Sequence, residues 1–97
     1  MKYLRFTMEN GEVWDVPASI IAESRAKYYA EKDPDTTFQE EVEYAMEDEY
    51  ACSKWAQGDM NWSEIKSHAI KRESAEKPDY QHLYCNAETE FVEVEDV

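Results

Sequence analysis

The dipeptide Asn10-Gly11 constrains the fold of this chain more than any other feature of the sequence. It lies between two runs with alternating apolar residues, 2–9 and 12–16. Asn-Gly is the preferred sequence of a two-residue type I′ turn, because both turn residues of that type need a positive φ. The chain is therefore predicted to begin with a β-hairpin.

A two-residue turn also determines the expected register of the hairpin. Met8 lies opposite Val13, and Leu4, Phe6 and Met8 form the face directed at the core. In that register Trp14 lies on the other face, where it is either covered by another element or exposed.

Two long helices are predicted to follow the hairpin. The first spans 17–32, with Pro17 at its first position, and it ends at the Asp33-Pro34-Asp35 turn because a residue before proline resists the helical conformation. The second spans about 37–57 as one continuous helix and stops at Gly58.

The remainder of the chain has weaker signals. A third, short helix is predicted to start at Asn61, where Glu64 is placed to complete a capping box. A loop is predicted over 73–79, and two strands are expected at 80–85 and 89–95.

These elements predict an α+β fold: an N-terminal β-hairpin, three helices and a C-terminal β element in two layers. A chain of 97 residues forms one domain. Its three Trp, seven Tyr and three Phe supply apolar area for a core despite a net charge of −13. Residues 88–97 are either part of this domain or a mobile acidic tail.

The acidic residues are concentrated in two segments. Segment 36–58 contains six acidic residues and one lysine, and segment 88–97 contains five acidic residues and no base. This distribution attracts a cationic partner and repels nucleic acid and anionic membrane surfaces. No apolar run is long enough to span a bilayer, and two cysteines form no disulfide framework of the secreted kind, so a cytoplasmic location is expected.

The second predicted helix carries the candidate binding residues. Acidic residues cover the side opposite its apolar arc. Tyr44 and Trp55 lie among them, and aromatic residues surrounded by charge are typical of interfaces that attract a basic partner. The alternative is that both aromatic residues belong to the core of a centrally placed helix. The candidate partner-binding residues are Glu40, Glu43, Tyr44, Glu47, Asp48 and Trp55.

The acidic residues also permit a narrower hypothesis. The six carboxylates from Glu40 to Glu49 span about 13 Å, or one per ~2–3 Å, if the helix is continuous. That density lies between those of single-stranded and duplex DNA, so this surface is a candidate nucleic-acid mimic. The alternative is that the carboxylates only solvate the helix.

Glu49 departs from the pattern because it projects into the apolar arc of the second helix. A carboxylate in a core needs a partner. Glu49 is therefore expected either to pair with Arg25 of the first helix or to lie at the edge of the core and reach water.

The sequence contains no recognisable catalytic motif. No phosphate-binding glycine loop or nucleophile elbow occurs, and no carboxylate pair is singled out for acid–base catalysis. The pair His82-x-x-Cys85 has zinc-ligand spacing, but a buried Cys52 and surface histidines are the favoured interpretation of these residues. The chain is predicted to be non-enzymatic, with no cofactor and no metal ion.

Four stretches carry a resemblance: Trp14-Asp-Val-Pro17, Arg25-Ala-Lys-Tyr-Tyr-Ala30, Trp55 and Met60-Asn-Trp-Ser63. In these the chain resembles small acidic proteins encoded by bacteriophages, cyanophages among them. The resemblance implies a host-directed interaction in the host cytoplasm. Host-directed interactions of this kind include the nucleic-acid mimicry seen in anti-restriction and anti-CRISPR proteins.

We therefore expect a non-enzymatic acidic protein that binds a basic protein surface, including that of a nucleic-acid-binding protein. The alternative is a homodimer or larger structural assembly. It would form through the hairpin face around Trp14 or through an edge strand at 91–94.

Overall fold

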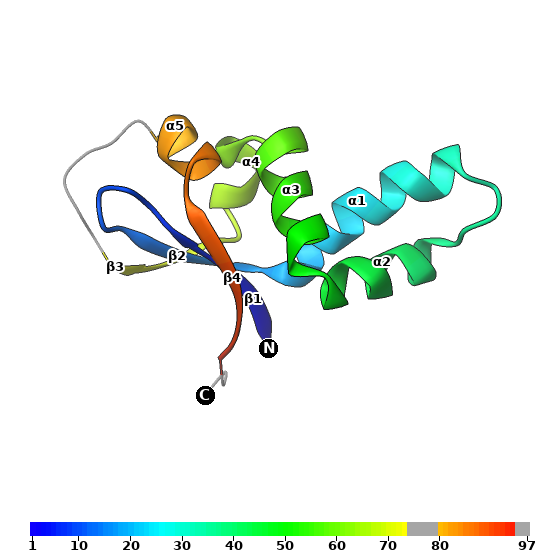
Figure 1. Ribbon diagram of the computed structural model, residues 1–97, viewed down its shortest axis with the longest axis horizontal. Helices are drawn as coiled ribbons and strands as arrows, with labels where there is room; N and C mark the ends of the chain where they lie inside the picture. Colours follow the sequence, from blue (N-terminus) through cyan, green and yellow to red (C-terminus); the bar gives the residue numbers. More distant parts are fainter. Residues whose placement is uncertain (74–79, 95–97) are drawn as a thin grey trace.

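The computed structural model of the chain describes residues 1–73 and 80–94 (Figure 1). Over these residues it contains a four-stranded sheet and five helices, which confirms the α+β class. The elements in chain order are β1 (Lys2–Thr7), β2 (Val13–Pro17), α1 (Ala18–Lys32), α2 (Phe38–Glu47), α3 (Glu49–Asp59), α4 (Trp62–Lys66), β3 (Ile70–Glu73), α5 (Tyr80–Cys85) and β4 (Glu88–Glu93).

The sheet is antiparallel and has the strand order β3-β2-β1-β4. Helices α3, α4 and α5 lie over one face of it, which gives the expected two layers. Helices α1 and α2 pack against each other and project beyond the sheet as an antiparallel pair (Figure 1). This pair, called the arm below, gives the molecule its longest dimension of 46 Å.

The hairpin is present, but its register differs from the prediction by one residue. Gly11 has φ 90°, and its N–H donates to the Met8 carbonyl at 2.9 Å. The Met8 N–H donates to the Glu12 carbonyl at 2.9 Å, so the loop has three residues with glycine in the left-handed position. Phe6 therefore lies opposite Trp14, which faces the core and is buried.

The prediction of one continuous second helix is wrong, because the helix breaks at Asp48 into α2 and α3. Asp48 is extended, with φ −116° and ψ 98°, and its carboxylate accepts the Ala51 N–H at 3.0 Å as the cap of α3. Aspartate is a strong N-cap. Asp48 would fit the acidic side of one long helix, but here it begins the new helix α3. The break lets α2 pack on α1 while α3 crosses the sheet.

The C-terminal third differs from the prediction in one element and adds another. Residues Tyr80–Cys85 form helix α5 rather than a strand, and β3 was not predicted. The predicted start of the third helix is confirmed by the Asn61 N–H, which donates to Glu64 Oε1 at 3.3 Å. Residues 88–93 form β4, while most of the loop predicted over 73–79 and the end of the acidic tail lie outside the described residues.

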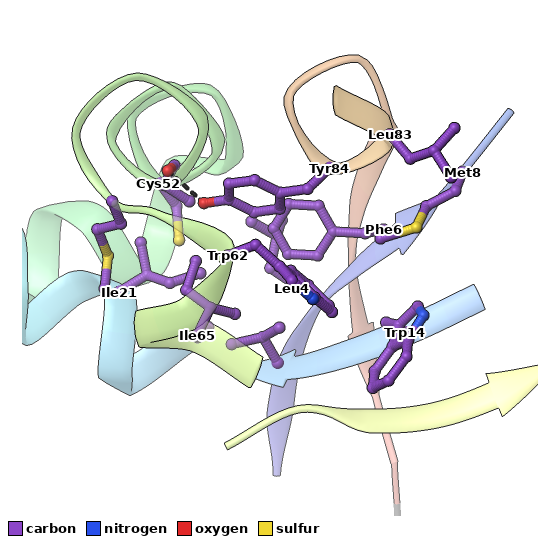
Figure 2. Close-up of a cluster of buried hydrophobic side chains, with 14 residues drawn as sticks. Leu4, Phe6, Met8, Trp14, Ile21, Cys52, Trp62, Ile65, Leu83 and Tyr84 are labelled. Carbon is purple, nitrogen blue, oxygen red and sulfur yellow. Dashed lines mark hydrogen bonds between the residues drawn. The ribbon is translucent and has the colours of Figure 1, made fainter. Parts of the chain in front are cut away.

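The core lies between the sheet and the helices (Figure 2). Phe6 of β1 contacts the Tyr84 ring of α5, with 5.2 Å between centroids, and Trp14 of β2 meets Trp62 of α4 edge-on at 5.0 Å. Cys52 of α3 is fully buried in this core, where burial raises the pKa of its thiol to about 12. The prediction of a buried structural Cys52 is confirmed.

Candidate protein-interaction surface

The predicted binding residues of α2 lie on the outer side of the arm. Glu40, Glu43 and Glu47 are exposed, and with Tyr44 they follow the i, i+3, i+4, i+7 spacing of one helix face. Tyr44 is 49% exposed. These four residues therefore form a continuous strip, called the acidic strip below.

Asp48 and Trp55 lie at the base of the arm. Asp48 is half-buried at the break between α2 and α3, where its carboxylate caps α3. Hydrogen bonding to Asp48 and the negative charge of that carboxylate raise the pKa of Tyr44 above its ordinary value. Asp48 is thus engaged within the chain, and it links Tyr44 to the start of α3.

Trp55 is half-buried against α1. Its indole N–H donates to Ser24 Oγ at 3.1 Å, and its ring contacts Tyr28 and Tyr29 at centroid distances of 5.3 and 5.9 Å. Trp55 therefore packs against Tyr28 and Tyr29 in an aromatic cluster and also forms part of the surface of that cluster.

An open pocket of about 220 Å³ lies where α1, α2 and α3 meet. Four aromatic residues line it, together with two cations, one carboxylate and one alanine. Pockets of this composition accept anchoring side chains in protein interfaces. The lining residues, called the aromatic pocket below, are Arg25, Tyr29, Tyr44, Tyr50, Ala51, Lys54, Trp55 and Asp59.

Arg25 holds the two helices of the arm together at this pocket. Its guanidinium carbon lies 4.5 Å from the Tyr29 ring centroid and 4.9 Å from that of Tyr44. Its Nη1 pairs with Glu41 Oε2 at 3.3 Å, with both side chains largely buried. Arg25 therefore pairs with Glu41, and the possible pair with Glu49 is wrong; Glu49 is exposed, as the alternative stated.

Sequence reasoning missed Arg25, Tyr29, Tyr50 and Lys54 as parts of this pocket. Tyr50 is 71% exposed at the start of α3, and Lys54 Nζ lies 5.6 Å from its ring centroid. The sequence held no sufficient signal for them, because a contiguous exposed aromatic patch marks an interaction site but its exposure is visible only in the structure. Among the exposed large apolar residues of the described chain, five lie on the arm or at its base: Tyr28, Tyr29, Phe38, Tyr44 and Tyr50.

The capping role of Asp48 gives a direct prediction. Replacing Asp48 by alanine should lower the free energy of unfolding by about 1 kcal/mol, because the cap of α3 is lost. Replacing it by asparagine keeps an oxygen for the Ala51 N–H and should change stability by less than about 0.5 kcal/mol. Both variants should lower the pKa of Tyr44 toward 10.0, because the carboxylate charge is gone.

Urea denaturation and an NMR pH titration of the Tyr44 ring measure the two effects separately. Equal stability of the alanine and asparagine variants would contradict the capping role.

The residues with metal-binding side chains are dispersed. Cys52 is buried in the core, whereas His68, His82 and Cys85 are exposed. In the part of the chain that the structure describes, no three His, Cys, Asp or Glu side chains gather as they would around a metal ion.

Among the described residues, no helix combines the length and the apolar character needed to cross a membrane. Comparison of the chain with protein-family models, with curated proteins and with solved structures gave no match.

Proposed function

We propose that this chain is a non-enzymatic interaction protein that binds a basic segment of another protein. The segment lies along the acidic strip and inserts a side chain into the aromatic pocket. One observation carries the proposal: an exposed aromatic pocket adjoins a helix face whose exposed charges are all negative. Aromatic anchors supply most of the energy of an interface, and surrounding charge selects and steers the partner.

The charge arrangement favours a protein segment over the narrower hypothesis of nucleic-acid mimicry. Glu41 pairs with Arg25, and Asp48 caps α3. The exposed carboxylates left on α2 are Glu40, Glu43 and Glu47, which span about 10 Å. Their spacing is wider than the ~1.7 Å between charges along duplex DNA. If the basic segment belongs to a nucleic-acid-binding protein, added duplex DNA should nevertheless compete for it.

Affinity capture from a lysate with matched variants tests the proposal. The variant Glu40→Gln/Glu43→Gln/Glu47→Gln should weaken binding of a captured basic protein about tenfold at low salt, since each rim charge contributes a modest amount. Tyr44→Ala/Tyr50→Ala should weaken it about tenfold or more at any salt concentration, because aromatic anchors are removed.

The matched control is Glu9→Gln/Glu23→Gln/Glu31→Gln, which removes the same number of exposed charges elsewhere. Binding should stay within about twofold of the parent in that control, apart from the general effect of net charge. A partner whose affinity falls equally in both triple variants recognises net charge alone, and the proposal is then wrong.

The exposed aromatic residues also support a second candidate function, a homo-oligomeric assembly. Surfaces of this kind associate with a second copy when the copies are complementary. Light scattering distinguishes the two functions. An oligomer that persists at high salt and dissociates in Tyr44→Ala/Tyr50→Ala would favour assembly, whereas a monomer would exclude it.

A further inference from the structure

Strand β4 forms an open edge of the sheet. Among the described residues it pairs with β1 alone. The pairing is regular over all six residues, from Lys2 opposite Glu93 to Thr7 opposite Glu88. The opposite edge strand, β3, is shorter and has an irregularity in its register. The β4 edge is therefore the better template for an added strand.

The hydrogen bonds at the end of the ladder show which groups of β4 point away from β1. Met1 and Val94 exchange both bonds: the Met1 amine donates to the Val94 carbonyl at 3.0 Å, and the Val94 N–H donates to the Met1 carbonyl at 3.1 Å. Bonded and non-bonded pairs alternate in an antiparallel ladder. Val92, Glu90 and Glu88 therefore also bond to β1.

The other residues of β4 have their N–H and C=O groups directed outward. These residues are Thr89, Phe91 and Glu93. The hairpin agrees with this assignment. The Met8 N–H donates to the Glu12 carbonyl, so the backbone N–H and C=O groups of the even-numbered residues of β1 are directed at β2, and those of the odd-numbered residues at β4. The free edge thus offers donors and acceptors at every second residue.

The side chains of this edge determine which strand can join it. Glu88 and Glu90 are exposed and share one face of the sheet with Val92, the face opposite the helices. A second copy of the chain would place glutamates near glutamates, and like charges on neighbouring strands repel. A strand with basic residues at these positions would form opposite-charge pairs instead.

We propose that the free edge of β4 binds an extended basic segment of another protein as a fifth, antiparallel strand. Basic residues of the segment lie opposite Glu90 and Glu88, and an apolar residue lies opposite Val92. Read in its own direction, the segment has the pattern apolar-x-basic-x-basic. This surface is separate from the aromatic pocket, so the inference stands without the proposed function.

Hydrogen exchange followed by NMR tests the proposal. In the free protein the amides of Thr89, Phe91 and Glu93 should exchange fast, and those of Glu88, Glu90 and Val92 slowly. The probe is a short synthetic peptide containing Val-Thr-Lys-Thr-Lys, with Val-Thr-Glu-Thr-Glu as its control. The lysine peptide should slow exchange of the three outward amides at least about tenfold at saturation, because they become hydrogen-bonded.

Two variants identify the contacts. Thr89→Pro removes one outward N–H and leaves the bonds to β1 in place, so peptide binding should be lost while the melting temperature changes little. Glu88→Gln/Glu90→Gln should weaken binding roughly fivefold through two cross-strand pairs. The triple variant of the acidic strip, Glu40→Gln/Glu43→Gln/Glu47→Gln, should still protect the same three amides.

Three results would overturn the inference. The first is binding of the lysine peptide without protection of the three outward amides. The second is equal protection by the glutamate peptide. The third is protection that rises with protein concentration and needs no peptide, which would make a second copy the occupant of this edge.

Discussion

Replacing Tyr84 by alanine should lower the free energy of unfolding by about 4 kcal/mol, in the range found for large aromatic residues in cores. Tyr84 is fully buried. Its ring contacts those of Phe6 and Trp62, with centroids 5.2 and 5.5 Å away, and its hydroxyl donates to the Ala56 carbonyl (Figure 2). The substitution therefore opens a cavity between α5, α4 and the sheet.

Urea denaturation of two further variants separates the contributions. Tyr84→Phe removes only the hydroxyl group and should cost about 1 kcal/mol, because a single neutral hydrogen bond is lost. Tyr50→Ala removes a side chain that is 71% exposed and should cost less than about 0.5 kcal/mol. If Tyr84→Ala cost no more than Tyr84→Phe, the ring would not be packed as described.

The contacts of Tyr84 also explain why helix α5 forms where the sequence suggested a strand. Residues 80–85 contain two tyrosines and a leucine over a length typical of strands and precede Asn86-Ala87, which suggests a turn; short runs of this kind do not distinguish strand from helix. Tertiary contacts decide the conformation. A helix places Leu83 and Tyr84 together on the core, and the side-chain amide of Gln57 of α3 donates to the Tyr84 carbonyl at 2.9 Å. Neither contact is visible locally.

The hairpin shows the limit of a strong local signal. Asn10-Gly11 predicted its existence correctly but not its register, because only Gly11 has a positive φ. A loop with one more residue reverses the face of each β2 side chain relative to the prediction. The three-residue loop brings Trp14 into the core and leaves Asp15 on the other face.

The candidate surface was predicted in part. Tyr44 and Trp55 were recognised from their positions on one helix, and the structure places both on one pocket. Arg25 and Tyr29 reach that pocket from α1, and the contact depends on how α1 and α2 pack. The break at Asp48 was not predicted because an aspartate suits both an acidic helix face and an N-cap, and only the packing distinguishes the two.

Replacing Asp15 by asparagine should lower the free energy of unfolding by about 3 kcal/mol at neutral pH. The Asp15 side chain is fully buried and forms a bidentate pair with Arg5, at 2.8 and 2.9 Å. Its Oδ2 also accepts from Arg72 Nε of β3 at 2.9 Å. Removing one partner from a buried ion pair typically costs 3–5 kcal/mol. The lower end of that range applies because both guanidinium groups are about a third exposed.

This loss should disappear in acid. Burial by itself would raise the pKa of Asp15, but the hydrogen bonds and charges of Arg5 and Arg72 outweigh it and lower the pKa below 3.8. A group with a lowered pKa in the folded state stabilises the fold above its unfolded pKa of about 3.9. As the pH falls through that value toward the folded pKa, the stabilisation is lost, because the unfolded state takes up a proton that the folded state does not yet bind.

Urea denaturation of the parent and Asp15→Asn at a series of pH values measures the effect. The difference in free energy should be constant from pH 7 to about pH 5 and should shrink as the pH falls below 4. Asp35→Asn is the control, since Asp35 is exposed and should leave stability unchanged within about 0.5 kcal/mol. Because Arg72 of β3 supplies one of the two guanidinium partners of Asp15, Arg72→Met should give a smaller loss with the same dependence on pH. A difference between the parent and Asp15→Asn that did not vary with pH would mean that the loss comes from replacing an acceptor oxygen by an NH2 group opposite the two arginines, not from the charge of Asp15.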